Sequence, residues 1–158
     1  KDKVTVLPLG YKPNLLNGSL FSRALQELLF STFAGIKARR YLNHKKFILI
    51  TYSPSIFLGI TMFLIKFGRD IKSILILRDI FPKWLDDLNI LNESSIKYKI
   101  LSLFESFLYK NSNYIGIQSE GNTQYFTGSY KEHHPKLFLL ENWLSTLPPV
   151  AINGDKKR

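Results

Sequence analysis

The chain has 158 residues, 45% of them hydrophobic and 14% aromatic, which excludes a disordered chain and predicts one domain with a sizeable core. Its 22 Lys and Arg against 12 Asp and Glu give a formal net charge of +10, so we expect an anionic neighbour: nucleic acid, an acidic membrane face or a phosphorylated ligand. The absence of cysteine excludes disulfides and thiolate metal sites, and it fits a cytoplasmic protein.

Short apolar runs alternate along the chain with longer stretches whose hydrophobic residues recur every three or four positions. This pattern predicts an α/β domain with a Rossmann-like, mostly parallel sheet, flanked by helices that make right-handed crossovers. The domain is expected to span residues 1–143, and residues 144–158 indicate the start of an interdomain linker. In chain order we expect the strand Val4–Leu9, the helix Leu20–Tyr41, the strand Phe47–Thr51, the helix Ser55–Phe67, the strand Ser73–Leu77, the helices Lys83–Leu88 and Ser94–Lys110, the strand Tyr114–Gln118, the helix Glu120–Phe126 and the strand Lys136–Leu140.

One uncharged run, Phe47–Ile65, is nearly as long as the roughly 20 apolar residues that span a bilayer. Its centre carries Ser53 followed by Pro54, a pair typical of a helix start, with the serine as N-cap and the proline in the first turn. We therefore divide the run into the buried strand Phe47–Thr51 and the helix Ser55–Phe67, which Gly68 stops, and we expect no membrane span there.

The first candidate site lies where the apolar strand Ser73–Leu77 ends abruptly in a charged pair, Arg78-Asp79. In open α/β sheets, ligands bind beyond the carboxyl ends of the strands. There Arg78 would hold an anionic oxygen, Asp79 would orient a hydroxyl, and Phe81-Pro82 would shape the wall. The alternative is that Arg78 and Asp79 pair with each other or with neighbouring residues.

Two further polar segments are expected at the same edge of the sheet, because each follows a predicted parallel strand. Ser53 follows one strand, and Ser119-Glu120-Gly121 follows another and opens a helix, so that its backbone amides would face a phosphate. A single glycine falls far short of a dinucleotide-binding fingerprint, however. An ordinary helix cap is the alternative for this segment.

Five cations lie close together around the end of the long helix, at Lys37, Arg39, Arg40, Lys45 and Lys46. They are either ordinary solvated surface charge or a patch that faces anionic lipid, where each basic residue contributes about 1 kcal/mol. Nucleic acid is a third interpretation, although no recognised nucleic-acid-binding motif accompanies these residues.

Four segments occur in an order that resembles a known family: Tyr52–Gly59, Leu77–Pro82, Ile117–Gly121 and Leu139–Trp143. Together they resemble the N-terminal domain of family 4 glycosyltransferases, particularly the bacterial enzymes that build O-antigen and capsule repeat units. The resemblance covers about residues 4 to 143, and it rests on the order of the four segments because no single one is specific.

The resemblance implies the N-terminal half of a GT-B fold, in which two Rossmann-like domains face each other across a cleft. The N-terminal domain of that family holds the acceptor, and the C-terminal domain binds most of the nucleotide sugar. Asp79 and Arg78 are then the catalytic candidates, but many relatives carry a His-Asp pair at this position, so the role of a catalytic histidine does not transfer. The substrate-binding residues that the resemblance implies are Ser53, Pro54, Phe81, Ser119, Glu120, Gly121 and Asn142.

Two parts of the family pattern are missing from the sequence. The C-terminal donor domain with its paired glutamates is absent, and the family's first strand and glycine-rich loop would precede Lys1. Because that strand normally lies in the middle of the sheet, we expect a gap there. The chain would close it by moving the Val4–Leu9 strand inward, or would associate with another copy of itself.

The resemblance implies a retaining glycosyltransferase that moves a sugar from a nucleotide sugar to a glycan acceptor, linked to a polyprenyl diphosphate, in bacterial surface polysaccharide synthesis. This chain alone is expected to be inactive. The resemblance implies that no cofactor and no metal are needed, and the sequence offers no Asp-x-Asp metal motif. The adjacent His133 and His134 also lack the spacing of a metal-binding pair. We expect it in the cytoplasm, peripheral on the inner face of the cytoplasmic membrane. The alternative is a non-enzymatic basic module that binds nucleic acid or a partner protein.

Overall fold

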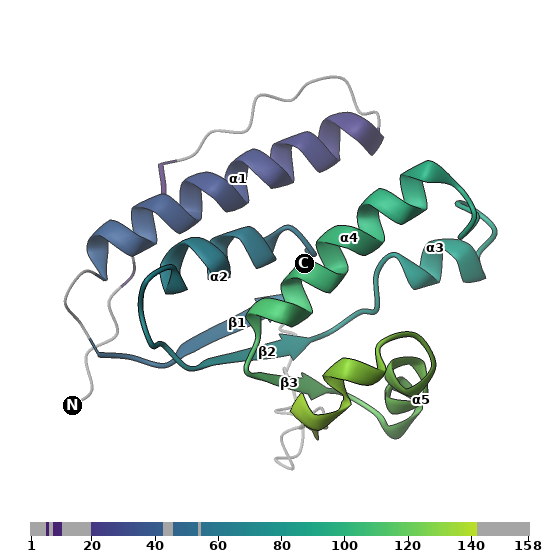
Figure 1. Cartoon of the computed structure of the whole chain (residues 1–158). Helices are drawn as coiled ribbons and strands as arrows, with labels where there is room; N and C mark the ends of the chain where they lie inside the picture. Colours follow the sequence, from purple (N-terminus) through teal and green to yellow (C-terminus); the bar gives the residue numbers. More distant parts are fainter. Residues whose placement is uncertain (1–5, 7, 11–19, 43–45, 54, 142–158) are drawn as a thin grey trace, which may run out of the picture.

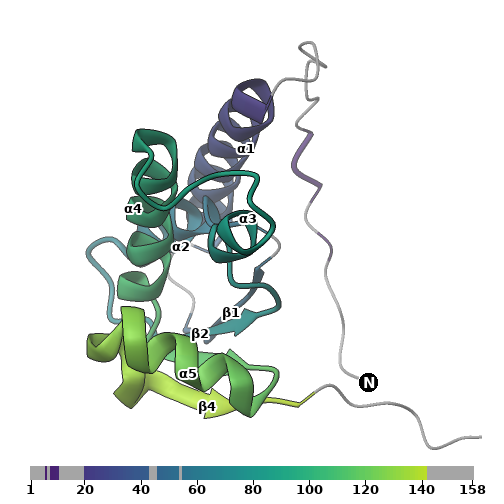
Figure 2. The same ribbon diagram turned by 90° about the vertical axis from the view of Figure 1, so that its right-hand side faces the viewer.

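The computed structural model describes residues 6, 8–10, 20–42, 46–53 and 55–141, with all of their side chains except those of residues 20 and 21. The helices are α1 (Leu20–Tyr41), α2 (Leu58–Lys66), α3 (Lys83–Asp87), α4 (Ile96–Asn111) and α5 (Glu120–Ser129), with a 3₁₀ helix η1 (Lys131–Lys136). The strands are β1 (Leu49–Ser53), β2 (Ser73–Leu77), β3 (Tyr114–Ile117) and β4 (Leu137–Leu139). They form one sheet in the order β1-β2-β3-β4 with parallel neighbours throughout, which confirms the Rossmann-like α/β prediction (Figures 1 and 2).

The bounds of α1 and β2 agree with the prediction, whereas β1 lies two residues further along the chain than expected. Ser53 is the last residue of β1, where it pairs with Leu77 of β2, and α2 begins only at Leu58. The expectation that Ser53 caps the helix is therefore wrong, because parallel pairing with β2 extends the strand through it. The Ser53 hydroxyl instead donates to the carbonyl of Ser55 at 3.1 Å. Pro54 lies outside the described residues.

The strand expected over Val4–Leu9 is absent from the described part of that segment, where Val6, Pro8 and Leu9 belong to no strand. The Lys37 Nζ on α1 donates to the carbonyls of Pro8 and Leu9, at 2.7 and 2.9 Å, so these residues lie against a helix. Pro8 also has no N–H to give to a strand ladder. The expected gap is not found either, because the four strands are continuous and a further strand can pair only outside β1 or β4.

The helices α2, α4 and α5 lie on one face of the sheet, and α1 packs on α2, one layer further from the strands (Figures 1 and 2). Two glycines permit the close helix contacts in this layer. A Cβ atom added at Gly59 of α2 would lie 2.9 Å from the Cα of Leu108 in α4, and one added at Gly35 of α1 would lie 2.8 Å from the Cδ1 of Leu64 in α2. Side chains at these two positions would push the helices apart.

The hydrophobic core fills the space between the sheet and these helices. Leu75 and Ile115, which are paired in register on β2 and β3, are both completely buried there. The rest of the core comes from the ends of the same two strands and from α2, α4 and α5, so one core holds the strands and helices together. Its buried members are Met62, Leu75, Leu77, Leu108, Tyr109, Ile115, Ile117 and Phe126.

The opposite face of the sheet is not covered by any helix in the described part of the chain. Successive side chains of a strand point to opposite faces, and the register places Ile50, Ile74 and Tyr114 side by side on this second face. Ile50 is 61% exposed, Tyr114 is 52% exposed, and Tyr52 on the same face is 51% exposed. An all-parallel sheet is normally covered on both faces, so this uncovered apolar face is unusual.

Candidate functional site

The carboxyl ends of the four strands meet at one edge, because Ser53, Leu77, Ile117 and Leu139 are partners in the parallel register. Arg78-Asp79 follows β2 at this edge, and the segment that begins α5 follows β3 at the same edge. The placement expected for the motif residues relative to the sheet thus agrees with the structure. Whether they form a site depends on how their side chains are held.

Arg78 and Asp79 are both exposed, and they do not pair with each other. Arg78 Nη1 donates to the hydroxyl of Tyr52 on the neighbouring strand, and its Cζ lies 5.6 Å from the centre of that ring. Asp79 makes no ion pair with any residue that the structure describes. The edge therefore presents a positioned guanidinium beside a carboxylate that is open to solvent, a pair able to bind an anion and to accept a hydrogen bond from a hydroxyl.

Two residues expected to contact substrate are held in the interior instead. Ser53 is only 5% exposed and its hydroxyl is used by the backbone of the next turn, so it does not present a free group at the edge. The ring of Phe81 is half-buried against Trp84, with ring centres 5.8 Å apart, and a cis peptide bond joins it to the buried Pro82. Phe81 and Pro82 shape the corner after β2, whereas Ser53 belongs to the end of β1, and none of the three offers a free polar group to a substrate.

The start of α5 is open to solvent at Ser119, Glu120 and Gly121. The Ser119 side chain makes no capping hydrogen bond, so the ordinary cap expected as the alternative is not formed by this hydroxyl. A Cβ atom at Gly121 would meet only the Ser119 Oγ, at 3.7 Å, so the position has room for a larger residue. Glu120 already places a negative charge in the first turn, where it favours the helix dipole and opposes a bound phosphate.

The expected basic patch is divided in the structure, because two of its cations are engaged within the fold. Lys37 holds the segment around Pro8, and Arg39 Nη1 donates to the carbonyls of Leu64 and Phe67 at 2.8 and 2.6 Å. Arg40 and Lys46 are exposed. The remaining positions assigned to these roles, Lys45 in the patch and Asn142 at the substrate, lie outside the described residues.

A buried carboxylate lies between α4 and α5, away from the predicted site. Glu105 is fully buried, and its Oε atoms accept hydrogen bonds from the hydroxyls of Tyr109 at 2.8 Å, Tyr125 at 3.1 Å and Tyr130 at 2.7 Å. Burial raises the pKa of Glu105 to about 7, against the opposing effect of the three hydroxyl donors. The pKa values of the three tyrosines are raised by burial and by the Glu105 charge, so their hydroxyls remain protonated donors.

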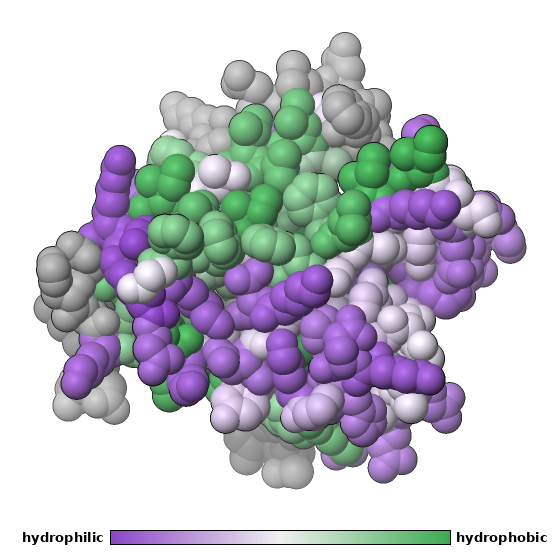
Figure 3. All heavy atoms as spheres, viewed as in Figure 1, coloured by the Kyte–Doolittle hydropathy of each residue, from purple (hydrophilic) through white to green (hydrophobic). Residues whose placement is uncertain are grey.

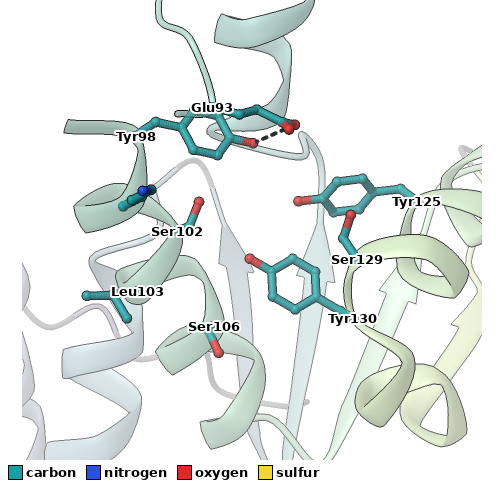
Figure 4. A pocket seen from close by; sticks show the side chains of 9 residues that line it. Glu93, Tyr98, Ser102, Leu103, Ser106, Tyr125, Ser129 and Tyr130 are labelled. Carbon is teal, nitrogen blue, oxygen red and sulfur yellow. Dashed lines mark hydrogen bonds between the residues drawn. The ribbon is translucent and has the colours of Figure 1, made fainter. Parts of the chain in front are cut away.

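An open pocket of about 510 Å³ lies over this cluster, between α4 and α5 (Figure 4). Tyr125 and Tyr130 point their hydroxyls into it toward α4, and Tyr98 closes one end by donating to Glu93 at 3.5 Å. The pocket is rich in hydroxyl groups that both donate and accept, so it suits a polar, hydrogen-bonding ligand. Its lining is Glu93, Tyr98, Lys99, Ser102, Leu103, Ser106, Tyr125, Ser129 and Tyr130.

His133 stands close to this cluster, 2% exposed and without a hydrogen bond to either ring nitrogen. It stacks on Tyr130, with ring centres 6.0 Å apart, and its Nε2 lies 3.7 Å from a carboxylate oxygen of Glu132. Burial lowers its pKa, so the imidazole is neutral at pH 7. In the described part of the chain no three His, Cys, Asp or Glu side chains are grouped as metal ligands.

The sequence did carry a partial signal for the Glu105 cluster. Tyr98, Glu105 and Tyr109 are spaced by seven and four residues, which places them on one face of a helix. Tyr125 and Tyr130 come from a later segment, and only the packing of α5 beside α4 adds them. The carboxylate was therefore hidden within an otherwise ordinary amphipathic pattern.

Comparison with models of known protein families finds no match, and neither curated proteins nor solved structures give one. The fold class rests on the strand order and register described above. Within the described residues, no helix combines the length and apolar character needed to cross a membrane. The family resemblance therefore stays a prediction from the sequence.

Proposed function

We propose that this chain is the acceptor-binding domain of a retaining, GT-B-type glycosyltransferase, which moves a sugar from a nucleotide sugar to a lipid-linked glycan acceptor in bacterial surface polysaccharide synthesis. The observation that supports it most is the parallel register, which brings Ser53, Arg78-Asp79 and Ser119 to one edge of the sheet. The resemblance requires these segments to be neighbours, although they are far apart in the sequence. Ligands of open parallel sheets bind at this edge.

The proposal gives different roles to the two charged residues. Asp79 is exposed and unpaired among the described residues, so its carboxylate is available to accept a hydrogen bond from the acceptor hydroxyl. Arg78 is held on Tyr52 at the same edge, where its guanidinium suits a diphosphate or other anionic oxygen. Ser53 would stabilise the turn after β1 and not contact the substrate.

A lipid-linked acceptor implies contact with the inner face of an anionic membrane. The exposed cations Arg40 and Lys46 and the net charge of +10 support such contact, because basic residues are drawn to an anionic leaflet. No metal or cofactor is part of the proposal.

Asp79→Asn tests the assignment, and Asp70→Asn is the matched control, because Asp70 is exposed at the opposite end of β2. In the full-length enzyme with its donor domain, we expect the first variant to lower turnover by at least about tenfold, with an unchanged melting temperature. Binding of a water-soluble, short-chain prenyl-diphosphate-linked N-acetylglucosamine to this chain, measured by calorimetry, should weaken in parallel. Asp70→Asn should change neither quantity.

Unchanged turnover in Asp79→Asn would remove this residue from the site. The alternative class predicts a different result in the same preparation: binding of duplex DNA that is independent of sequence and steeply dependent on salt. Such binding without any affinity for the prenyl-diphosphate glycan would favour the basic module over the glycosyltransferase domain.

A further inference from the structure

The outer surface of α1, α2 and α4 is hydrophobic over a wide area (Figure 3). The side chains that contribute are large, and several are more exposed than buried. Leu103 is 70% exposed and Ile96 is 76% exposed, although both belong to a helix whose other side packs into the core. The exposed apolar residues are Leu25, Leu29, Phe33 and Ile36 of α1, Phe63 and Phe67 at α2, and Ile96, Ile100 and Leu103 of α4; we call them the apolar helix surface.

Aromatic contacts join this surface across the helices. The ring of Phe63 on α2 lies 5.5 Å from that of Phe67 and 5.7 Å from that of Phe107 on α4, measured between centres. The Cζ of Arg39 from α1 lies 5.9 Å from the centre of the Phe67 ring. These contacts join the α2 and α4 parts of the apolar helix surface, and Arg39 connects them to α1. Large exposed apolar areas mark interaction sites.

Cations stand at the border of the apolar helix surface. Lys99, Leu103 and Lys110 are spaced by four and seven residues, so the two lysines lie along the same side of α4 as the most exposed leucine. Arg40 follows Ile36 by one helical turn on α1. All three cations are exposed, and none makes an ion pair with a residue that the structure describes. In Figure 3 hydrophilic side chains border the hydrophobic area along its lower side.

This arrangement favours one kind of occupant. A second copy of the chain would bring another net charge of +10, and with it another row of cations, against the same border. An anionic bilayer offers both complements at once, since its acyl boundary accepts Leu, Ile and Phe side chains while its phosphates meet Lys and Arg at the edge.

We propose that the apolar helix surface lies in the interface of an anionic lipid bilayer, with Ile100 and Leu103 inserted at the acyl boundary and Lys99 and Lys110 at the level of the phosphates. This inference rests on the peripheral membrane contact of the proposed function, but it assigns that contact to the apolar helix surface on α1, α2 and α4, with Arg40 as the one cation taken from the basic cluster at the end of α1. It does not depend on the chemistry at Asp79.

Co-sedimentation with vesicles tests the proposal. We expect the full chain to sediment with vesicles of phosphatidylcholine and phosphatidylglycerol in equal parts, and far less with pure phosphatidylcholine. The double variant Ile100→Gln/Leu103→Gln should lower the partition coefficient by at least about tenfold, because two exposed apolar side chains lose their transfer into lipid. Glutamine is a good helix former, so α4 should remain intact.

The matched control is Ile50→Gln/Tyr114→Gln, which changes two similarly exposed apolar residues on the uncovered face of the sheet. It should stay within about twofold of the wild type. Lys99→Gln/Lys110→Gln should weaken binding to the anionic vesicles and reduce its salt dependence, with binding to neutral vesicles unchanged.

Three results would overturn the proposal: wild-type binding by the Ile100→Gln/Leu103→Gln variant, a loss that occurs only in the sheet-face control, or a wild-type protein that stays in the supernatant with anionic vesicles. Sedimentation velocity without lipid tests the remaining candidate occupant, a second copy of the chain. A dimer that Ile100→Gln/Leu103→Gln abolishes would show that the surface binds a second copy. Glycan binding at Asp79 is measured with a soluble acceptor and no vesicles, so its result is independent of all of these outcomes.

Discussion

The two faces of the sheet consist of the same four strands and similar apolar residues, but they lie in opposite environments. Leu75 and Ile115 on one face are 0% exposed beneath the helices, whereas Ile50 and Tyr52 on the other are 61% and 51% exposed. The residues themselves do not explain this contrast, since isoleucine occurs on both faces. It arises because every helix that packs on the sheet within the described part of the chain lies on one side.

The contrast shows where the described fold is incomplete. A parallel sheet is ordinarily a middle layer with helices on both sides, because its strands are apolar on both faces. Among the described strands β1 is also an edge strand, so within this part of the chain an unpaired backbone edge and an uncovered face occur together. A further strand-and-helix unit beside β1 would pair the backbone edge and cover the open face. A second chain that associates at this edge would do the same with less specificity.

The largest expected effect comes from truncating the same residue type on each face. Ile115→Ala should lower the free energy of unfolding by about 2–5 kcal/mol, because it leaves a cavity in the core. Ile50→Ala should lower it by less than about 1 kcal/mol, because its side chain is already in water. Urea denaturation measures both values. Similar losses for the two variants would mean that the second face is covered in solution.

The next effect concerns the polar cluster on the covered side. The pKa of Glu105 is about 7 in the folded chain, above its ordinary value of 4.5, so the folded state keeps a proton that the unfolded state has released. The contribution of Glu105 to the free energy of unfolding should therefore be largest below about pH 4.5 and should fall by roughly 3 kcal/mol as the pH rises to 7. Thermal or urea unfolding across this range measures the slope.

Two variants isolate the contribution of Glu105 from that of other carboxylates. Glu105→Gln should flatten the profile between pH 4.5 and 7, since the titrating group is gone. Glu120→Gln, at an exposed position in the first turn of α5, should keep the wild-type profile. A slope that persists in Glu105→Gln would assign the pH dependence to a different group.

The smallest expected effect is association through the uncovered face. We expect the isolated chain to self-associate weakly, and more strongly at high salt, because salt screens the repulsion between copies of charge +10. Ile50→Lys should weaken association by about tenfold, whereas Leu88→Lys, at a residue of similar exposure elsewhere, should not. Sedimentation velocity at low and high salt distinguishes this from vesicle binding, which salt should weaken. A chain that stays monomeric at high salt would contradict the prediction.

Local patterns predicted the type of most elements correctly. The apolar run Ser73–Leu77 predicted the bounds of β2, and the helical spacing within Leu20–Tyr41 predicted those of α1. Both predictions hold because a buried strand needs a continuous apolar run and a packed helix needs one apolar stripe. The local pattern predicted wrongly at Ser53. It indicated a helix cap there, but Ser53 pairs with Leu77 as the last residue of β1. It also failed over Val4–Leu9, since the described residues of that segment are held by a lysine from α1.

The candidate site divides in the same way. The position of Arg78 and Asp79 at the carboxyl edge followed from the order of strands, because parallel strands all end on one side. The contact from Arg78 to Tyr52 did not follow, since it needs β1 as the neighbour of β2. The tyrosine cluster around Glu105 could not be predicted from the sequence either, because its hydroxyl donors come from segments that meet only in the folded chain.

The sequence by itself determined that this is an α/β chain, that it is strongly basic, and that the charged pair Arg78-Asp79 follows a strand. These properties depend only on composition and on the spacing of residues near one another in the chain. Among the residues that the structure describes, the tertiary structure decided which apolar side chains are buried, which cations make no ion pair, and that no helix covers one face of the sheet. Those outcomes depend on which segments meet in space. Isoleucine is a core residue at Ile115 of β3 and a surface residue at Ile50 of β1, because in the described part of the chain helices pack against the first and not against the second.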